Sequence, residues 1–267
     1  MITDRLKQAR CFLLDMDGTV YLSERLLPGA KELLNYLDQQ NIPYYFITNN
    51  STRSRQHYAA KLTHLGLPTL AEQIITSGEA TAIYLTDLHP GARLYVVGTP
   101  ILEEELREHG FEIVQNDPDF VVLGFDTTLT YAKIWKLCDY VRAGVRYIAT
   151  HADINCPTED GFMPDVGAMM AMIATSTGRQ PDVVIGKPNQ PIVQAILLKT
   201  GLSPQDLVMV GDRLYTDIAL GMTGIATVLV LSGETRLENL LGSPFQPDYM
   251  VENLLELYEC IVDIDGR

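Results

Sequence analysis

Two aspartates one residue apart, Asp15 and Asp17, close an apolar run that begins at Phe12. Residues two apart at the end of a strand point the same way, so both carboxylates can share one small site. Gly18 follows, and it allows a sharp turn that brings a backbone amide close to an anion. Neighbouring carboxylates repel each other, which raises the pKa of one or requires a cation between them. One acid could then attack an electrophile while the other transfers a proton, although a solvated turn fits the same pattern.

Three later apolar runs also end in polar residues. These residues are Thr48, Asn49, Asn50 and Ser51, then Lys187, and finally Asp212 with Asp217 close behind. Taken singly, each group also fits a helix cap or a solvated charge. In open α/β sheets, ligands bind outside the carboxyl ends of parallel strands. We therefore expect these groups to gather around one ligand at a sheet edge.

The segments that carry these residues alternate between predicted strands and predicted helices. The first predicted helix has Leu33, Leu34 and Leu37 on one face and lies between two buried strands. A strand, a helix and a strand in that order form a right-handed crossover in a parallel sheet. A separate β-α-β-β-α-β rhythm, typical of an inserted domain, occupies the middle of the chain. The predicted domains are a core of 1–78 and 181–267 and an inserted α/β cap of 79–180.

The composition of the chain limits the possible binding partners and the cellular compartment. A formal net charge of −14 without a basic cluster argues against nucleic acid, whereas a small phosphorylated metabolite fits if a metal ion reverses the local field. No apolar stretch is long enough for a membrane span, and Met1–Arg10 lacks the apolar core of a signal peptide. The four cysteines are scattered without Cys-x-x-Cys spacing, so we expect buried thiols in a cytoplasmic protein.

Several carboxylates at one sheet edge would be unfavourable without a cation. Their oxygen atoms suit Mg²⁺, which also binds phosphate oxygens. A carboxylate that attacks phosphorus fits this set and would form an aspartyl-phosphate intermediate. Mg²⁺, Lys187 and backbone amides would neutralise the equatorial oxygens of the transferred group. The Gly-x-Ser-x-Gly, P-loop and Gly-x-Gly-x-x-Gly motifs of other enzyme classes are absent from the sequence.

Together, four motifs resemble the haloacid dehalogenase (HAD) superfamily, specifically its NagD-like phosphatases with a large C2 (type IIA) cap. The motifs are Asp15-Met16-Asp17-Gly18-Thr19, Ile47-Thr48-Asn49-Asn50-Ser51, Gly186-Lys187-Pro188 and Gly211-Asp212-Arg213-Leu214-Tyr215-Thr216-Asp217. They stand in the family's order, and the resemblance covers nearly the whole chain. It implies a Rossmann-like parallel-sheet core with an inserted α/β cap.

The resemblance also implies a role for each motif residue. Asp15 would be the nucleophile and a metal ligand, and Asp17 would be the general acid and base, with its carbonyl on the metal. Asp212 would bind Mg²⁺, with Asp217 behind it. The phosphate would be held by Gly18, Thr48, Asn49, Asn50 and Lys187. The reaction would be hydrolysis of a nucleoside monophosphate, a sugar phosphate or an aryl phosphate such as 4-nitrophenyl phosphate.

In such relatives the cap selects the leaving group and often forms homodimer contacts. Here the loop from His151 to Gly167 is expected to reach across a cleft, with His151, Asp153 and Asp165 as candidate substrate contacts, although an ordinary surface loop fits its composition as well. Relatives commonly have a Pro-Gly-x-Gly-Ser-like stretch where this chain has Pro164-Asp165-Val166-Gly167-Ala168. This stretch adds a negative charge and lacks a hydroxyl, so the substrate cannot be assigned by analogy with these relatives.

Two alternatives stay open at this point. Phosphoryl transfer to a second hydroxyl of a sugar phosphate, as in a mutase, would use the same groups as hydrolysis. A protein that only binds a phosphorylated metabolite would keep the site without turnover. A dehalogenase fits less well, because Asp17 and the metal ligands would have no role in an attack on carbon.

Overall fold

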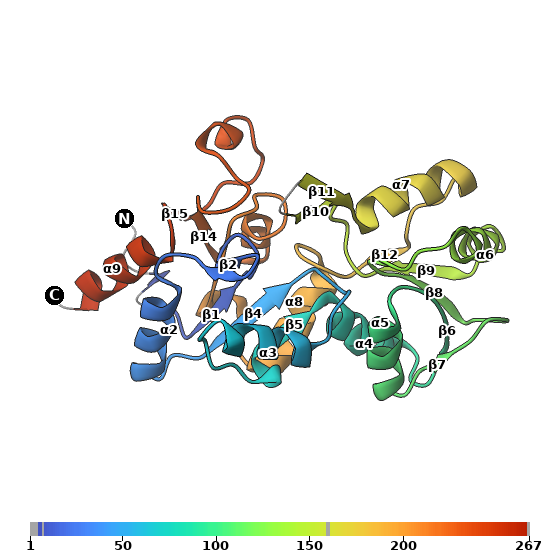
Figure 1. Ribbon diagram of the computed structural model, residues 1–267, viewed down its shortest axis with the longest axis horizontal. Helices are drawn as coiled ribbons and strands as arrows, with labels where there is room; N and C mark the ends of the chain where they lie inside the picture. The colour runs from blue at the N-terminus through green and yellow to red at the C-terminus, as the bar shows by residue number, and fades with distance from the viewer. Residues whose placement is uncertain (1–4, 7, 159–160, 266–267) are drawn as a thin grey trace. The chain divides into compact units, whose positions relative to one another are not determined.

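A computed structural model describes residues 5–6, 8–158 and 161–265 (Figure 1). Part of the segment Met1–Arg10, which was weighed as a signal peptide, therefore lies outside the described residues. The chain forms two compact units: the first is Met1–Ile47, Tyr58–Ile75 and Ile196–Arg267, and the second is Thr48–His57 and Thr76–Ala195. This division follows compactness alone, and the core and cap boundaries at 1–78, 79–180 and 181–267 stay a prediction.

A six-stranded sheet organises the first unit, in the order β15-β14-β13-β1-β4-β5. Its strands are β1 (Cys11–Leu14), β4 (Tyr44–Thr48), β5 (Ile74–Thr76), β13 (Leu207–Gly211), β14 (Ala226–Val230) and β15 (Tyr249–Val251). β1 pairs in parallel with β4 and β13, and Leu14 lies opposite Val210. All four residues of β1 are buried, as expected for a central strand of a parallel sheet. Because of this register, the residues after β1 and β13 leave the sheet at the same edge.

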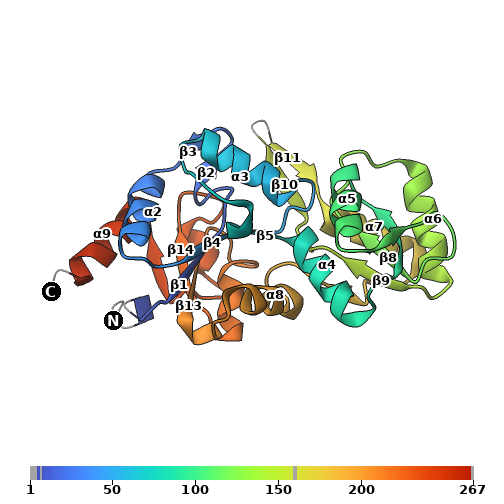
Figure 2. The ribbon, with the colours of Figure 1, turned by 90° about the horizontal axis from the view of Figure 1, so that it is seen from below.

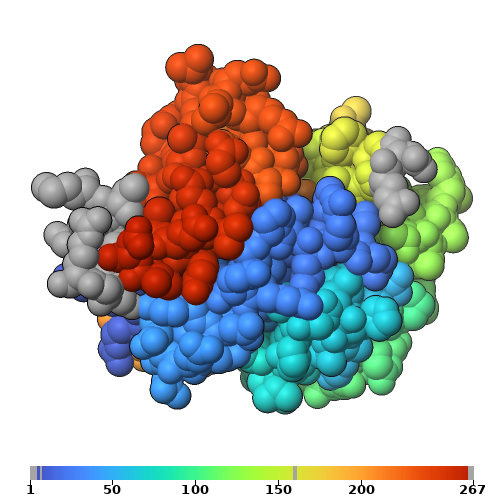
Figure 3. Space-filling view, turned by 60° about the vertical axis from the view of Figure 1, so that its left-hand side comes forward, coloured from blue at the N-terminus to red at the C-terminus, as the bar shows by residue number. Residues whose placement is uncertain are grey.

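Helices α2 (Ala30–Gln39) and α9 (Leu254–Asp265) lie side by side in the first unit, and Figure 3 shows red α9 against the blue N-terminal segments. Leu33 and Leu37 of α2 belong to the same buried cluster as Phe12 of β1, which confirms the predicted helix face. Further elements flank the strands of this sheet along the chain. They are the helices α3 (Arg55–His64) and α8 (Gln190–Thr200), the small strands β2 (Tyr21–Leu22) and β3 (Arg25–Leu26), and the 3₁₀ helices η1 (Ala71–Gln73), η2 (Pro204–Asp206), η3 (Ile218–Thr223) and η4 (Leu237–Leu240).

The second unit has a five-stranded sheet in the order β12-β9-β8-β6-β7, with parallel pairs throughout. Its strands are β6 (Arg93–Val97), β7 (Glu112–Ile113), β8 (Phe120–Leu123), β9 (Arg146–Ala149) and β12 (Val183–Val184). Figure 1 shows α4 (Ser77–Leu88) and α5 (Pro100–Glu108) on one face of this sheet and α6 (Tyr131–Arg142) and α7 (Val166–Thr177) on the other. The expected α/β class, with two parallel sheets and helices around them, is confirmed.

The stretch expected as a loop from His151 to Gly167 is partly regular. It contains the antiparallel hairpin of β10 (Asn155–Thr158) and β11 (Gly161–Pro164), visible in Figure 2, and α7 begins directly after it. The carboxylate of Asp165 accepts a hydrogen bond from the Val166 amide at 2.6 Å and caps α7. Asp165 before an apolar run was thus a helix-start signal that the loop interpretation missed. No helix among the described residues combines the length and apolar character needed to cross a membrane.

Candidate active site

Three carboxylates come together in the first unit. Asp15 follows β1, Asp212 follows the neighbouring β13, and Asp217 stands at the N-cap of η3. One carboxylate oxygen from each lies within 4.8 Å of the others. Asp212 and Asp217 are buried, whereas Asp15 is partly exposed. Clustered carboxylate oxygens are the donors that Mg²⁺ prefers, so these residues fit a hard divalent cation.

Asp212 is held by hydrogen bonds within this acid cluster, which we define as Asp15, Asp212 and Asp217. Its Oδ1 accepts a hydrogen bond from the Thr19 hydroxyl at 3.2 Å, and its Oδ2 accepts one from the Glu234 amide at 2.6 Å. Burial, followed by the charge of Asp217, raises the pKa of Asp212 to about 6. The charged form is therefore disfavoured in the protein without a cation, and a bound cation would reverse this effect.

Glycines make room for Asp212. A Cβ atom on Gly18, which has a φ of 89°, would lie 2.6 Å from Asp212 Oδ2, and one on Gly233 would lie 2.0 Å from the same atom. The Gly18 carbonyl accepts a hydrogen bond from the Ser232 hydroxyl at 2.8 Å. Its amide, expected to face an anion, donates to the Tyr21 carbonyl at 2.8 Å. Gly18 therefore shapes the turn around Asp212 with its amide engaged inside that turn.

Asp17 contacts Tyr21. The Tyr21 hydroxyl donates to Asp17 Oδ2 at 3.2 Å, and the two residues also form an isolated parallel bridge. Burial raises the pKa of Tyr21, and Asp17 raises it further, so the phenol stays protonated and remains a donor. The bond orients the carboxylate of Asp17. Tyr21 was not predicted, because nothing in the local pattern marks its hydroxyl as a partner of an acid four residues earlier.

The polar loop after β4 belongs to the second unit and is held by side-chain hydrogen bonds. Asn49 Oδ1 accepts from the Lys187 amide at 2.8 Å, and Asn49 Nδ2 donates to the Lys187 carbonyl at 3.2 Å and to Asp153 Oδ1 at 2.9 Å. The Ser77 hydroxyl donates to the Asn49 carbonyl. Asn49, Lys187 and Asp153 are all at most 6% exposed. The amide of Asn49 thus holds the main chain of Lys187 as a neighbouring strand would.

The rest of this loop is also cross-linked. The Asn50 amide donates to Thr48 Oγ1 at 3.1 Å, and Asn50 Oδ1 accepts from the amide and the hydroxyl of Thr52 at 2.9 and 2.7 Å. Ser51, considered as a helix cap, instead accepts from the Phe125 amide at 3.0 Å. The first turn of α3 is capped by Ser54, whose Oγ accepts from the His57 amide at 3.3 Å. The order of this loop therefore comes from its own side chains.

The candidate cap residues His151 and Asp165 contact each other. His151 is fully buried, with Nε2 3.0 Å from Asp165 Oδ1 and Nδ1 2.9 Å from Thr150 Oγ1. Since Asp165 also caps α7, this pair connects the end of β9 to the start of that helix. Asp153, by contrast, contacts Asn49. Sequence reasoning selected these residues but did not anticipate that their side chains pair with one another and with Asn49.

Comparisons with known proteins agree with the motifs. Residues 12–112 match the family model described as haloacid dehalogenase-like hydrolase, and residues 184–257 match a second HAD-hydrolase-like model. The acid sugar phosphatase of Staphylococcus saprophyticus is 36% identical over 254 residues, covering 94% of this chain and 98% of the relative. The 5′-nucleotidase YutF of Bacillus subtilis is 34% identical over 252 residues, with 94% and 98% covered.

Solved structures extend the similarity to the fold. A 4-nitrophenylphosphatase from Thermotoga maritima superposes with a TM-score of 0.94 at 45% identity, covering 97% of this chain and 99% of that one. NagD from Escherichia coli K-12 superposes with a TM-score of 0.86 at 33% identity, covering 93% and 98%. Phosphatases recur among these proteins, and each is matched over nearly its whole length. The chain therefore belongs to the haloacid dehalogenase superfamily and is a phosphatase of its NagD-like type.

Proposed function

We propose that this phosphatase hydrolyses the phosphomonoester of a small metabolite with Mg²⁺, through an aspartyl-phosphate on Asp15. The observation that carries the proposal is the acid cluster, whose carboxylate oxygens lie within 4.8 Å of one another. The named relatives act on a sugar phosphate, a 5′-nucleotide or 4-nitrophenyl phosphate, which share the phosphomonoester bond. The shared bond favours a common chemistry with different leaving groups.

The donor set of the acid cluster supports the choice of Mg²⁺. The carboxylates of Asp15 and Asp212 and the main-chain carbonyl of Asp17 would bind the ion. Asp217 would lie next to these ligands without binding the ion directly. When bound, Mg²⁺ neutralises charge on the phosphoryl oxygens. The raised pKa of Asp212, about 6, supports a site that is complete only with a cation present.

Asp15 and Asp17 divide the chemistry in this proposal. A carboxylate oxygen of Asp15 forms a bond to phosphorus while the bond from phosphorus to the leaving oxygen breaks. Asp17 gives its proton to the leaving alkoxide and then takes one from the water that splits the acyl phosphate. The Tyr21 hydroxyl, 3.2 Å from Asp17 Oδ2, orients this acid for both steps. The products are an alcohol and inorganic phosphate.

Phosphate binding is assigned to the polar loop and the lysine. The Thr48 hydroxyl, whose oxygen accepts from the Asn50 amide, and the main-chain amide of Asn49 would donate to phosphoryl oxygens, and the Lys187 ammonium would neutralise their charge. The hydrogen bonds of Asn49 to both main-chain groups of Lys187 support this assignment, because they keep the loop and the lysine in a fixed relation.

Phosphate release from 4-nitrophenyl phosphate tests the proposal. We expect activity with Mg²⁺, none after chelation, and a loss of about 10⁴-fold or more in Asp15→Asn. Asp139→Asn on the exposed surface of α6 is the matched control and should retain activity. Wild-type rates in Asp15→Asn would exclude the nucleophile role. Product analysis with added sugar alcohols separates hydrolysis, which we expect, from transfer to a second hydroxyl.

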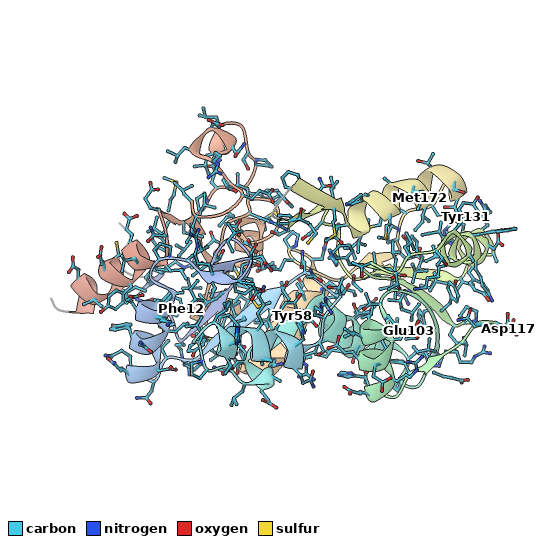
Figure 4. The ribbon with its side chains drawn as sticks, in the orientation of Figure 1. Phe12, Tyr58, Glu103, Asp117, Tyr131 and Met172 are labelled. Atoms are coloured by element: carbon cyan, nitrogen blue, oxygen red, sulfur yellow. The ribbon has the colours of Figure 1, made fainter. Side chains whose placement is uncertain are left out.

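We also propose that the enzyme is a homodimer through its second unit. Tyr131 and Trp135 of α6 are 83% and 62% exposed, and with Met172 of α7 they line a groove of about 340 Å³. Tyr131 and Met172 are labelled in Figure 4. The charged residue of this lining is Arg142, so two acidic chains can meet here without opposing carboxylates. Trp135→Glu should convert a dimer to a monomer in sedimentation analysis, whereas Leu198→Glu at another exposed apolar residue should not.

A cytoplasmic location is the remaining part of the proposal. Its support is the cysteine chemistry: Cys11 and Cys138 are buried free thiols. Burial raises the pKa of the Cys11 thiol to about 12, which suits an inert packing residue. Fractionation of cells of the source organism should recover the protein with cytoplasmic markers; recovery from the medium or the periplasm would contradict this location.

A further inference from the structure

A pocket of about 370 Å³ opens on the second unit beside the polar loop. Its polar lining is formed by Asn50, Thr52, Arg53, Thr99, Thr127 and Thr128. Resting on the proposed function, we propose that this pocket receives the leaving group and prefers a polyhydroxylated one, a sugar or a sugar acid, over a nucleoside. The pocket lies at the small end of the usual range for ligand sites, which suits one sugar ring.

The position of the pocket connects it to the phosphate. Asn50, which lines the pocket, is the next residue after Asn49, and its amide donates to Thr48 Oγ1 at 3.1 Å. A phosphoryl group held by Thr48 and Asn49 would therefore contact residues that directly precede a lining residue of the pocket. The pocket therefore offers the leaving group a place next to the loop that would bind the phosphate.

The polar side of the pocket matches sugar hydroxyls. Each threonine hydroxyl can donate and accept, as a sugar hydroxyl does. The Thr52 hydroxyl donates to Asn50 Oδ1 at 2.7 Å, which leaves its oxygen able to accept from a ligand. Thr127 is exposed at the pocket. Among the described residues that line the pocket, none carries a carboxylate, so this lining does not favour a cationic leaving group.

Arg53 gives the pocket a positive charge. It is exposed, and no ion pair among the described residues includes it. The guanidinium presents a fork of donors that fits vicinal hydroxyls or a carboxylate. Sugar acids, which offer both groups, should bind at least as well as neutral sugars.

The apolar side of the pocket does not suit a nucleobase. Phe125 is the aromatic residue of the lining, and it is 3% exposed, so its ring offers no open face. Proteins that bind unpaired bases commonly stack them on exposed aromatic or guanidinium faces. Without an aromatic platform, a nucleoside monophosphate would gain little from its base in this pocket.

Two measurements test the inference. Calorimetry on Asp15→Asn, which should bind without turnover, compares 6-phosphogluconate, glucose 6-phosphate, AMP and inorganic phosphate. Steady-state kinetics compare 6-phosphogluconate, glucose 6-phosphate, AMP and 4-nitrophenyl phosphate as substrates. They are measured on the wild-type enzyme and on single variants that keep Asp15. We expect Arg53→Gln to raise KM for both sugar phosphates about tenfold with little change in kcat, and to change 4-nitrophenyl phosphate less than twofold. Thr127→Val should act in the same direction by a smaller factor.

Arg107→Gln on the exposed side of α5 is the matched control and should change none of these values. The inference is overturned if AMP binds more tightly than both sugar phosphates, or if Arg53→Gln leaves sugar phosphate binding unchanged. Failure of the proposed function has a different signature: no release of phosphate from 4-nitrophenyl phosphate by the wild-type enzyme. In that case calorimetry with the sugar phosphates still decides the inference.

Discussion

The polar clusters of the two units are built in opposite ways. In the first unit, the acid cluster brings three carboxylates within 4.8 Å and burial raises the pKa of Asp212. In the second unit, Asn49, Lys187 and Asp153 are buried, and the Asn49 side chain forms hydrogen bonds with the Lys187 main chain and the Asp153 carboxylate. The first arrangement opposes folding until a cation binds, and the second supports folding by itself. In the first unit, the arrangement needed for activity therefore lowers the stability of the metal-free protein. In the second unit, the same hydrogen bonds serve both the site and stability.

Among the changes that compare the two clusters, Asp212→Asn should give the largest effect. We expect activity to fall about 10³-fold, because a charged metal ligand is lost. At pH 7.5 the metal-free variant should nevertheless be more stable than the metal-free wild type, by about 1 kcal/mol, since a repelled buried charge is gone. Denaturant unfolding in chelator measures the second effect. A less stable variant would contradict the account of this cluster.

The pH dependence of that difference follows from the pKa of Asp212, which folding raises from 3.8 to about 6. Folded protein then binds the proton more tightly than unfolded protein, so the stabilising contribution is fully present below about pH 4 and is lost as the pH rises through 6. The gap between variant and metal-free wild type should therefore open between pH 4 and 6. A gap independent of pH would contradict the assignment of this pKa.

Asn49→Leu should give the next largest effect, with the opposite sign for stability. The change leaves the Lys187 amide and carbonyl without their partner in a buried place, and we expect a loss of about 3 kcal/mol together with loss of activity. Denaturant unfolding with and without Mg²⁺ measures it. Asn116→Leu, at an exposed residue of the same unit, is the control and should cost less than about 0.5 kcal/mol.

Added Mg²⁺ should sharpen the comparison by stabilising the first cluster alone. At a concentration of a hundred times its Kd, the ion should raise the free energy of unfolding by about 2.7 kcal/mol. The increment should nearly vanish in Asp212→Asn and persist in Lys187→Met. Thermal or denaturant unfolding across a Mg²⁺ titration gives the values. An equal increment in all three proteins would place the ion elsewhere.

Tyr21→Phe should give the smallest of these effects. It removes the hydroxyl that donates to Asp17 Oδ2 while keeping the buried ring. We expect kcat to fall about tenfold, because the acid loses its orientation, with KM nearly unchanged. Tyr140→Phe, which also removes a tyrosine hydroxyl bonded to one acceptor, should leave kcat alone. Equal losses in both variants would remove the special role of Tyr21.

The sequence predicted the acids better than it predicted their surroundings. Asp15 and Asp212 could be placed because buried parallel strands deliver the residues after them to one edge, which is a local pattern. The hydrogen-bond partners of the loop residues could not be predicted, because the bond between Asn49 and Lys187 joins residues 138 positions apart. The role of Gly233 could not be predicted for the same reason, since a glycine is needed there only because Asp212, which follows another strand, approaches it closely. The hairpin of β10 and β11 lacks apolar alternation, and α7 was hidden behind a proline and an aspartate that suggested a loop.

The side chain of Asn49 binds only main-chain atoms of residue 187, so these hydrogen bonds do not depend on the side chain at position 187. A cysteine placed there could be alkylated to give ammonium groups of graded length and basicity on an unchanged backbone. With Cys156 and Cys260 replaced by serine, because both are only partly buried, the protein offers a semisynthetic series in which the reach and proton affinity of one cation vary. Rates across that series would report how finely phosphoryl chemistry depends on where a positive charge is delivered.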